Sequence, residues 1–246
     1  MQSHSVAMSV SLAGFAAAGE ERRAFDAVVF DLDGVVVDTE RILHDLWVDM
    51  FARYGCSFTL EEYSAVVGSD HGFDPLAVLV ERSTLPIPSL AELEMEVAEN
   101  EQSRLKGLSA LPGVREWIEA AERLGMGLAV ASSSPPVWVR ARLKDVGLDA
   151  HFSVVSGRDG RLPAKPEPDL YLDACSRLGV EPARAIAVED SANGLQAAHA
   201  AGLFCVAVPN SVTREHDLSA ADLLVESLAA VSLEQALRCL AAQKGA

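Results

Sequence analysis

The chain has 246 residues and a formal net charge of −16, from 36 acidic and 20 basic side chains. Half of the residues are hydrophobic, which excludes a largely disordered protein, and no apolar run reaches the roughly 18–20 residues of a membrane-spanning helix. The strong negative charge disfavours nucleic acids and anionic lipid surfaces as partners. Length and composition therefore fit a globular domain that carries a smaller insertion.

Residues 1–24 are expected to form a loose N-terminal extension. Their first 20 residues are mostly small and apolar but contain no Lys or Arg, so the basic start of a secretion signal is missing. The four cysteines form no Cys-x-x-Cys pair, which favours free thiols in a reducing compartment. We therefore expect a cytoplasmic protein, either a monomer or a small homo-oligomer, with no membrane or nucleic acid partner.

Short strand-like runs alternate with helical patterns in residues 25–36 and 109–246. Four apolar runs predict buried strands at residues 27–30, 127–131, 185–188 and 204–208. Segments with helical periodicity, most of them ending close to a glycine, lie at residues 114–124, 137–146, 169–178 and 193–201. This alternation predicts an α/β fold, with a Rossmann-like, doubly wound parallel sheet and helices on both faces.

The segment 37–108 departs from this alternation. It contains helical patterns and no convincing strand, with helices expected at residues 40–54, 60–66, 73–82 and 90–106. An all-helical insertion directly after the first strand predicts a cap domain over the carboxyl edge of the sheet. The catalytic core would then consist of residues 25–36 and 109–246.

Two aspartates follow the first predicted strand directly. Asp31 and Asp33 are separated by one residue and precede Gly34, which permits a sharp turn. Because ligands bind at the carboxyl ends of strands in an open α/β sheet, this pair can share a divalent metal. The two carboxylates can equally divide the roles of nucleophile and proton donor. Taken alone, the pattern is also typical of a polar exit from a strand.

Hydroxyl groups and a lysine follow in a similar setting. Ser132 and Ser133 end the second strand before a helix, where hydroxyl and N–H groups bind anions, although simple helix capping also explains serine there. Lys165, one of only four lysines, lies in a proline-stiffened loop among acidic residues. An ammonium held there offsets repulsion between carboxylates and phosphate oxygens. A lysine in a surface turn is the plainer alternative.

A second acidic pair, Glu189 and Asp190, ends a further strand just before a helix. Adjacent acids in this position suit Mg²⁺, which binds a few carboxylates together with water and substrate oxygen atoms. Capping of the following helix by Asp190 or Ser191 is the alternative. All four polar clusters are expected at one edge of the sheet, around a single crevice.

In combination, these clusters resemble the four motifs of the haloacid dehalogenase superfamily. The motifs are Asp31-x-Asp33, Ser132, Lys165-Pro-x-Pro-Asp-x-Tyr171 and Glu189-Asp190-Ser-x-x-Gly194, and the similarity covers roughly residues 25–210. The resemblance implies a Mg²⁺-dependent phosphatase with a helical cap. Its substrate would be a small phosphorylated metabolite of the sugar phosphate, sugar-acid phosphate or phosphoglycolate class.

The resemblance also implies roles for the motif residues. Asp31 would be the nucleophile that forms an aspartyl-phosphate, and Asp33 would protonate the leaving oxygen and then activate water. The phosphoryl group would be held by Ser132, Ser133 and Lys165. The candidate metal ligands are Asp31, Asp33 through its main-chain carbonyl, Asp190, and Glu189 either directly or as a support for the other ligands.

A mutase of the β-phosphoglucomutase type is the alternative enzyme. The valine after Gly34 resembles that subgroup, but Leu43 stands where such mutases carry a cap histidine, and His44 follows one place late. Gly68 and His71 are candidate cap contacts to the substrate, and this segment offers only His71 to bind a second phosphate. We therefore expect a phosphatase, with a mutase as the alternative and a non-catalytic binding protein as the least favoured reading.

Overall fold

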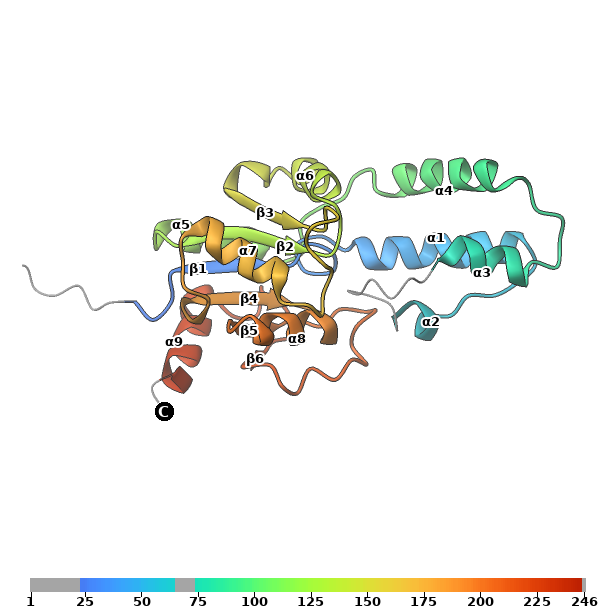
Figure 1. The fold of residues 1–246 in the computed structure, drawn as a ribbon. Coiled ribbons are helices and arrows are strands. Elements are labelled where there is room, and N and C mark those ends of the chain that lie inside the picture. The colour runs from blue at the N-terminus through green and yellow to red at the C-terminus, as the bar shows by residue number, and fades with distance from the viewer. Residues whose placement is uncertain (1–22, 65–73, 245–246) are drawn as a thin grey trace, which may run out of the picture.

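The computed structural model describes residues 23–64 and 74–244. At its centre lies a six-stranded parallel sheet with the strand order β3-β2-β1-β4-β5-β6 (Figure 1). The strands are β1 Ala27–Phe30, β2 Gly127–Ser132, β3 Val154–Gly157, β4 Ala185–Glu189, β5 Phe204–Ala207 and β6 Leu223–Leu224. The expected α/β class, with its Rossmann-like parallel sheet, is confirmed.

The strand order creates a crevice at the end of β1. From β1 the chain builds β2 and β3 on one side of the sheet and then crosses to build β4, β5 and β6 on the other side. Val28 of β1 is therefore paired with Leu128 of β2 and with Ile186 of β4. Since the connections leave β1 and β4 in opposite directions, their carboxyl ends form the position at which open α/β sheets bind ligands.

Helices cover both faces of the sheet because successive strand residues point to opposite sides. On one face, Val28 and Phe30 pack with the helices α5 Val114–Arg123, α6 Pro136–Asp145 and α9 Leu233–Lys244. On the other face, Ala27 and Val29 pack with α7 Asp169–Leu178 and α8 Ala192–Ala200. Two short 3-10 helices, η1 Asp149–His151 and η2 Pro182–Arg184, complete this part of the chain.

A helical insertion, defined here as α1–α4, projects beyond the carboxyl ends of the strands (Figure 1). Its helices are α1 Thr39–Arg53, α2 Leu60–Ser64, α3 Pro75–Arg82 and α4 Leu90–Arg104. They surround an apolar cluster that includes Phe51, Leu79 and Leu93, and Val212 enters this cluster from the loop after β5. The two connections to the sheet run side by side, because the Leu111 N–H donates to the Val36 carbonyl at 2.9 Å.

Several elements differ from the sequence expectation. The helix α9 and the strands β3 and β6 were not among the predicted elements. The two strands give a weak signal, because β3 ends in Ser156-Gly157 and β6 has only two residues. Within the described ranges 23–64 and 74–244, every helix is too short or too polar to cross a lipid bilayer. The candidate cap residues Gly68 and His71, and residues 1–22 of the expected extension, lie outside the described residues.

Candidate active site

Three strand ends bring the predicted site residues to one edge of the sheet. Asp31 follows β1, Ser132 ends β2, and Glu189 ends β4, so all three leave the sheet at its carboxyl edge. The Asp31 N–H donates to the Val188 carbonyl at 2.9 Å, which continues the β1–β4 pairing into the loop. The backbone pairing of two strands therefore holds the first aspartate in its place.

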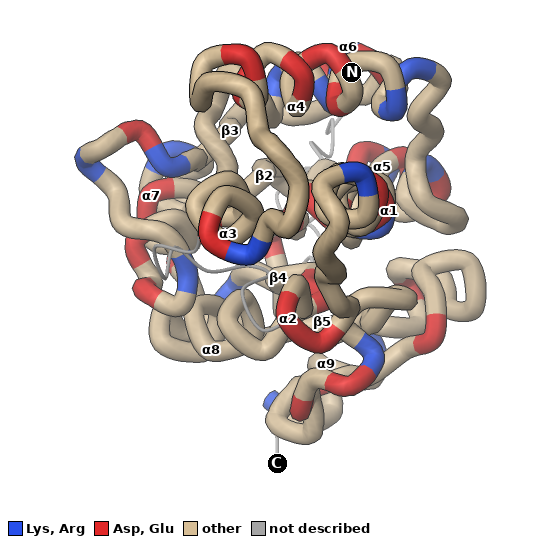
Figure 2. Tube along the Cα trace, turned by 90° about the vertical axis from the view of Figure 1, so that its right-hand side faces the viewer, with Lys and Arg blue, Asp and Glu red and all other residues tan. Residues whose placement is uncertain are grey.

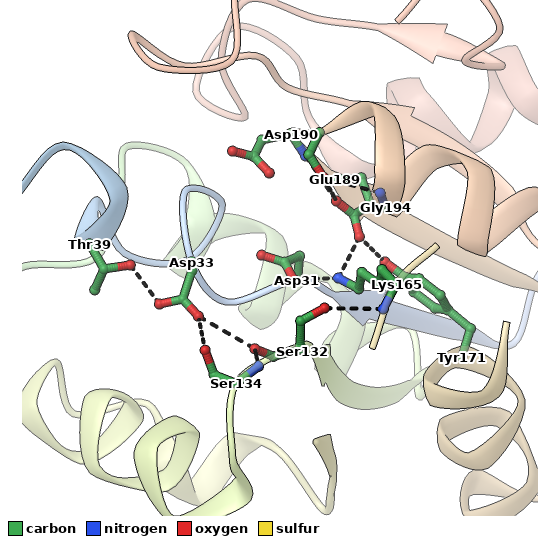
Figure 3. Close-up of polar contacts among 12 residues, drawn as sticks. Asp31, Asp33, Thr39, Ser132, Ser134, Lys165, Tyr171, Glu189, Asp190 and Gly194 are labelled. Carbon is green, nitrogen blue, oxygen red and sulfur yellow. Dashed lines mark hydrogen bonds and ion pairs between the residues drawn. The ribbon is translucent and has the colours of Figure 1, made fainter. Parts of the chain in front are cut away.

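Lys165 joins the two acidic motifs. Its side chain is buried and its ammonium donates to Asp31 Oδ1 and, at 2.6 Å, to Glu189 Oε1 (Figure 3). Burial by itself would lower the pKa of Lys165, but the two carboxylates outweigh burial and hold the pKa above its usual value. Lys165 thus carries a permanent positive charge next to Asp31.

Both carboxylate oxygens of Glu189 accept hydrogen bonds from neighbouring groups. Its Oε1 accepts a second hydrogen bond from the Tyr171 hydroxyl at 2.5 Å, and its Oε2 accepts from the Asp190 N–H at 3.2 Å. A Cβ at Gly194 would lie 2.0 Å from the Glu189 carboxyl carbon, so only glycine leaves room for this side chain. The structure therefore directs Glu189 toward Lys165 and away from the carboxylate of Asp190.

Asp190 turns to the opposite side of the strand end (Figure 3). Its Oδ2 accepts from Asn210 Nδ2 at 2.6 Å and from the Thr213 hydroxyl at 3.4 Å. Gly34 has a positive φ of 90°, and a Cβ there would lie 2.3 Å from the same oxygen. Close approach of the loop after β1 to Asp190 consequently requires a residue without a side chain.

Negative charge exceeds positive charge in this buried cluster. Asp31, Glu189 and Asp190 are all less than 10% exposed, and Lys165 is the one basic side chain bonded to them among the described residues. Burial raises the pKa of Asp31 and of Asp190 well above the ordinary value; Lys165 lowers both pKa values, while the Glu189 carboxylate raises both. The cluster therefore lacks positive charge, which a bound cation would supply.

The donor set fits a magnesium ion. Residues 23–64 and 74–244 contain no group of three or more His, Cys, Asp or Glu side chains arranged to hold a metal ion. Magnesium, however, is commonly bound by only one or two carboxylates, with water and substrate oxygens completing the octahedron. Asp31 and Asp190 are two buried carboxylates on neighbouring strand ends with raised pKa values, so they meet this smaller requirement.

Asp33 points away from Asp31 and toward α6 and the start of α1. Its Oδ1 accepts from the Thr39 hydroxyl at 2.6 Å, and its Oδ2 accepts from the Ser134 hydroxyl at 2.8 Å (Figure 3). The Trp138 indole N–H also donates to Oδ1, at 3.3 Å. Asp33 therefore connects the sheet edge with the first helix of the insertion.

The predicted phosphate-binding serines lie between these groups. Ser132 Oγ donates weakly to Asp33 at 3.4 Å and accepts from the Ser134 N–H at 3.0 Å. Ser133 Oγ accepts from the Lys165 N–H at 3.2 Å, which ties the serine loop to the lysine loop. Both hydroxyl groups thus lie close to the carboxylate and lysine cluster.

Some residues of the site were not predicted. Thr39 is one of them: Asp38 caps α1 by accepting a 3.4 Å hydrogen bond from the Arg41 N–H, while the Thr39 hydroxyl donates to Asp33. Asn210 was missed as well. The rule that parallel strand ends meet at one edge would have pointed to it, because it lies three residues beyond the end of β5.

The chain matches the family model of haloacid dehalogenase-like hydrolases over residues 25–202. Among curated proteins, it is 37% identical over 207 residues to the Bacillus subtilis (strain 168) protein YhcW, covering 84% of this chain and 94% of that protein. It is 31% identical over 179 residues to the phosphorylated carbohydrates phosphatase of Thermotoga maritima, covering 72% and 82% respectively.

A solved structure gives the same result. The structure of CbbY from Rhodobacter sphaeroides in complex with phosphate has a TM-score of 0.69 and 30% identity, and the match covers 83% of this chain and 95% of that one. A second structure of that protein, in a mutant form, holds xylulose-(1,5)bisphosphate and has the same TM-score. This chain therefore belongs to the haloacid dehalogenase-like hydrolase family, and the relatives that it resembles include phosphatases.

Proposed function

We propose that this hydrolase is a phosphatase that removes phosphate from a small phosphorylated metabolite through an aspartyl-phosphate. The observation that carries the proposal is the buried contact of Lys165 with Asp31 at the end of β1. A carboxylate attacks a phosphate ester only if positive charge offsets the repulsion between them. Lys165 provides part of this charge, and its contact with Glu189 keeps it beside the nucleophile.

Asp31 and Asp33 divide the chemistry. An Asp31 carboxylate oxygen forms a bond to phosphorus while the bond from phosphorus to the ester oxygen breaks, and Asp33 gives its proton to that oxygen. Water then attacks the phosphorus atom of the aspartyl-phosphate, Asp33 takes the proton from the water, and Asp31 is released with inorganic phosphate. Asp33 has to turn from Thr39 and Ser134 toward Asp31 for these transfers.

The remaining motif residues hold the transferred group and a metal. Ser132 and Ser133 supply hydroxyl groups to its oxygens, together with the Lys165 ammonium. Asp31, the main-chain carbonyl of Asp33 and Asp190 would hold Mg²⁺, while Glu189 holds Lys165 and is not a ligand. When bound, Mg²⁺ supplies positive charge that stabilises the transferring phosphoryl group.

We further propose that residues 37–108 act as a cap that excludes bulk water during the reaction. The position of Thr39 supports this role, because it links the first helix of the insertion directly to Asp33. Leu43, and not His44, lines the cavity between α1 and α6, which favours a phosphatase over the mutase alternative. The names of the relatives, which include phosphatases of phosphorylated carbohydrates and hexitols, support a sugar-type phosphate as substrate.

The test is hydrolysis of p-nitrophenyl phosphate by the full chain. We expect phosphate release that requires Mg²⁺ and stops on addition of EDTA, and we expect Asp31→Asn to abolish it while the melting temperature stays within a few degrees. A phosphoenzyme trapped at low pH should disappear in the same variant. Full turnover by Asp31→Asn would refute the assignment, and isomerisation of β-glucose-1-phosphate would favour the mutase.

A further inference from the structure

A cavity of about 570 Å³ lies between α1 and α6 and includes Asp33 in its wall. Its apolar wall is formed by Leu43, Pro135, Val137, Trp138 and Ala141. Its polar groups are Asp33, Glu40 and Ser134. Because Asp33 is the proposed proton donor to the leaving oxygen, the part of the substrate beyond that oxygen would enter this cavity.

The charged groups that face the cavity are carboxylates. Asp33 and Glu40 line it, and no Lys or Arg is among the described residues that do so. Glu101 of α4 is a further carboxyl group near Asp33. Burial raises its pKa, the positive charge of Arg142 lowers it, and the negative charge of Asp33 raises it by a smaller amount. No lining residue in the described part of the chain would form an ion pair with a further anion, so burial of one there is unfavourable.

Arg142 of α6 is near this region, where its positive charge lowers the pKa of Glu101 and its buried Nε has no hydrogen-bond partner among the described residues. Its guanidinium carbon lies 4.6 Å from the centre of the Trp138 ring, and one of its nitrogens lies 2.9 Å from Asp145 Oδ2 on the same helix. Arg142 thus stacks on Trp138 and interacts with Asp145 and Glu101, and it is not one of the residues that line the cavity.

The helical insertion offers no free arginine over the cavity. Figure 2, which faces the end of the insertion, shows basic positions beside acidic ones on α1 and α3. Each described arginine of the insertion has an acidic partner, as follows: Arg41 with Asp45, Arg53 with Glu96, Arg82 with Glu62, and Arg104 with Asp49. In the sequence, moreover, residues 54–81 contain neither Lys nor Arg.

We propose that the substrate is a phosphate monoester whose only anionic group is the phosphate to be transferred, and whose leaving group is uncharged or cationic with an apolar face. This inference rests on the proposed phosphatase function and narrows its substrate class. A second phosphate or a carboxylate in the cavity would lie against its apolar wall and the carboxyl groups of Asp33 and Glu40, with no Lys or Arg among the described lining residues to pair with it. An anion buried without such a partner is costly, and this cost discriminates between ligands. Glu40 instead suits a hydroxyl or ammonium donor of the leaving group.

The proposal distinguishes this enzyme from a relative whose structure holds a compound with two anionic groups. The solved CbbY structure holds xylulose-(1,5)bisphosphate. For the present chain, a bisphosphate of that kind is expected to be a poor ligand. The same holds for phosphoglycolate and sugar-acid phosphates, which carry a carboxylate besides the phosphate.

The experiment compares four compounds that share a hexose skeleton as inhibitors of p-nitrophenyl phosphate hydrolysis. They are glucose 6-phosphate, glucosamine 6-phosphate, 6-phosphogluconate and glucose 1,6-bisphosphate. We expect the two compounds with an added anion to have inhibition constants more than about tenfold higher than that of glucose 6-phosphate, corresponding to about 1.4 kcal/mol. Glucosamine 6-phosphate should bind at least as well as glucose 6-phosphate.

A pair of variants tests whether the cavity is the cause. Leu43→Lys places a cation in the part of the cavity wall that α1 forms. It should reduce or reverse the difference in inhibition constant between glucose 6-phosphate and the two compounds with a second anionic group. Val80→Lys adds the same charge to an exposed position of α3 outside the cavity and should leave the difference unchanged. An effect of similar size in both variants would point to net charge alone and would overturn the proposal.

The inference and the proposed function fail differently. The inference is overturned if the two compounds with a second anionic group inhibit the wild-type enzyme as tightly as glucose 6-phosphate, or more tightly. Hydrolysis of p-nitrophenyl phosphate would still support the phosphatase. Absence of Mg²⁺-dependent hydrolysis refutes the proposed function instead. In that case calorimetry measures the affinities of the wild-type protein for the same four compounds. Tighter binding of the two compounds with a second anionic group overturns the inference there as well.

Discussion

Replacing Glu40 with Gln is expected to change how the stability of the protein depends on pH. Glu40 is the second residue of α1, and its carboxylate accepts a hydrogen bond of 2.7 Å from the Tyr63 hydroxyl. Burial, assisted by the negative charge of Asp33, raises the pKa of Glu40 from 4.5 to about 7. The folded protein therefore keeps a proton on this carboxyl at pH values where the unfolded chain has lost it.

The direction of the effect follows from proton linkage. Between pH 4.5 and about 7 the folded state binds more protons than the unfolded state, so the free energy of unfolding falls as the pH rises through this window. One pKa unit corresponds to about 1.36 kcal/mol, so the loss is at most about 3 kcal/mol. Glu40→Gln keeps the shape of the side chain and an acceptor for Tyr63 but cannot ionise. It should gain up to about 3 kcal/mol relative to the wild type above pH 7 and little at pH 4.5.

Urea denaturation of both proteins at several pH values from about 4.5 to 8, with EDTA present, measures this difference. EDTA removes any contribution from metal binding. Glu94→Gln, which removes a carboxylate from the exposed part of α4, is the control for the loss of one charge. Wild-type and Glu40→Gln curves that remain parallel over the whole range would refute the reasoning about the Glu40 environment.

Three further substitutions test the buried cluster. Lys165→Met should lower turnover by about 10²–10³-fold. It should also destabilise the fold by about 3–5 kcal/mol, because Asp31 and Glu189 remain buried without their cation. Unchanged kinetics would exclude a role of Lys165 in catalysis. Gly194→Ala should lower turnover, since its Cβ would lie 2.0 Å from the Glu189 carboxyl carbon and displace it from Lys165; wild-type turnover and melting temperature would contradict this. Asn210→Ala removes a 2.6 Å hydrogen bond to the proposed metal ligand on the β4 loop and should raise the Mg²⁺ concentration for half-maximal turnover by about 10–100-fold, whereas an unchanged Mg²⁺ titration would disprove that role.

The local pattern of the chain was sufficient to predict the fold class and to group the candidate site residues. Strand-like runs that alternate with helices predict a parallel sheet, and parallel strands release their next residues at one edge. Asp31 and Lys165 are far apart in sequence and meet as hydrogen-bonded partners in the buried cluster. The family resemblance followed from the same residues, and the family match confirms it. Very short elements such as β6 escaped because two residues carry no periodicity.

The side to which each polar group turns was decided by the tertiary structure alone. Glu189 and Asp190 are neighbours in sequence, yet one binds Lys165 and the other binds Asn210, because the fold brings the loop that carries each partner to a different side of the β4 end. Thr39 contacts Asp33 only because the insertion returns its first helix to the sheet edge. The cavity beside Asp33 arises in the same way, because its lining comes from residues 33–43 and 134–141, which are distant in sequence and come together only in the folded protein.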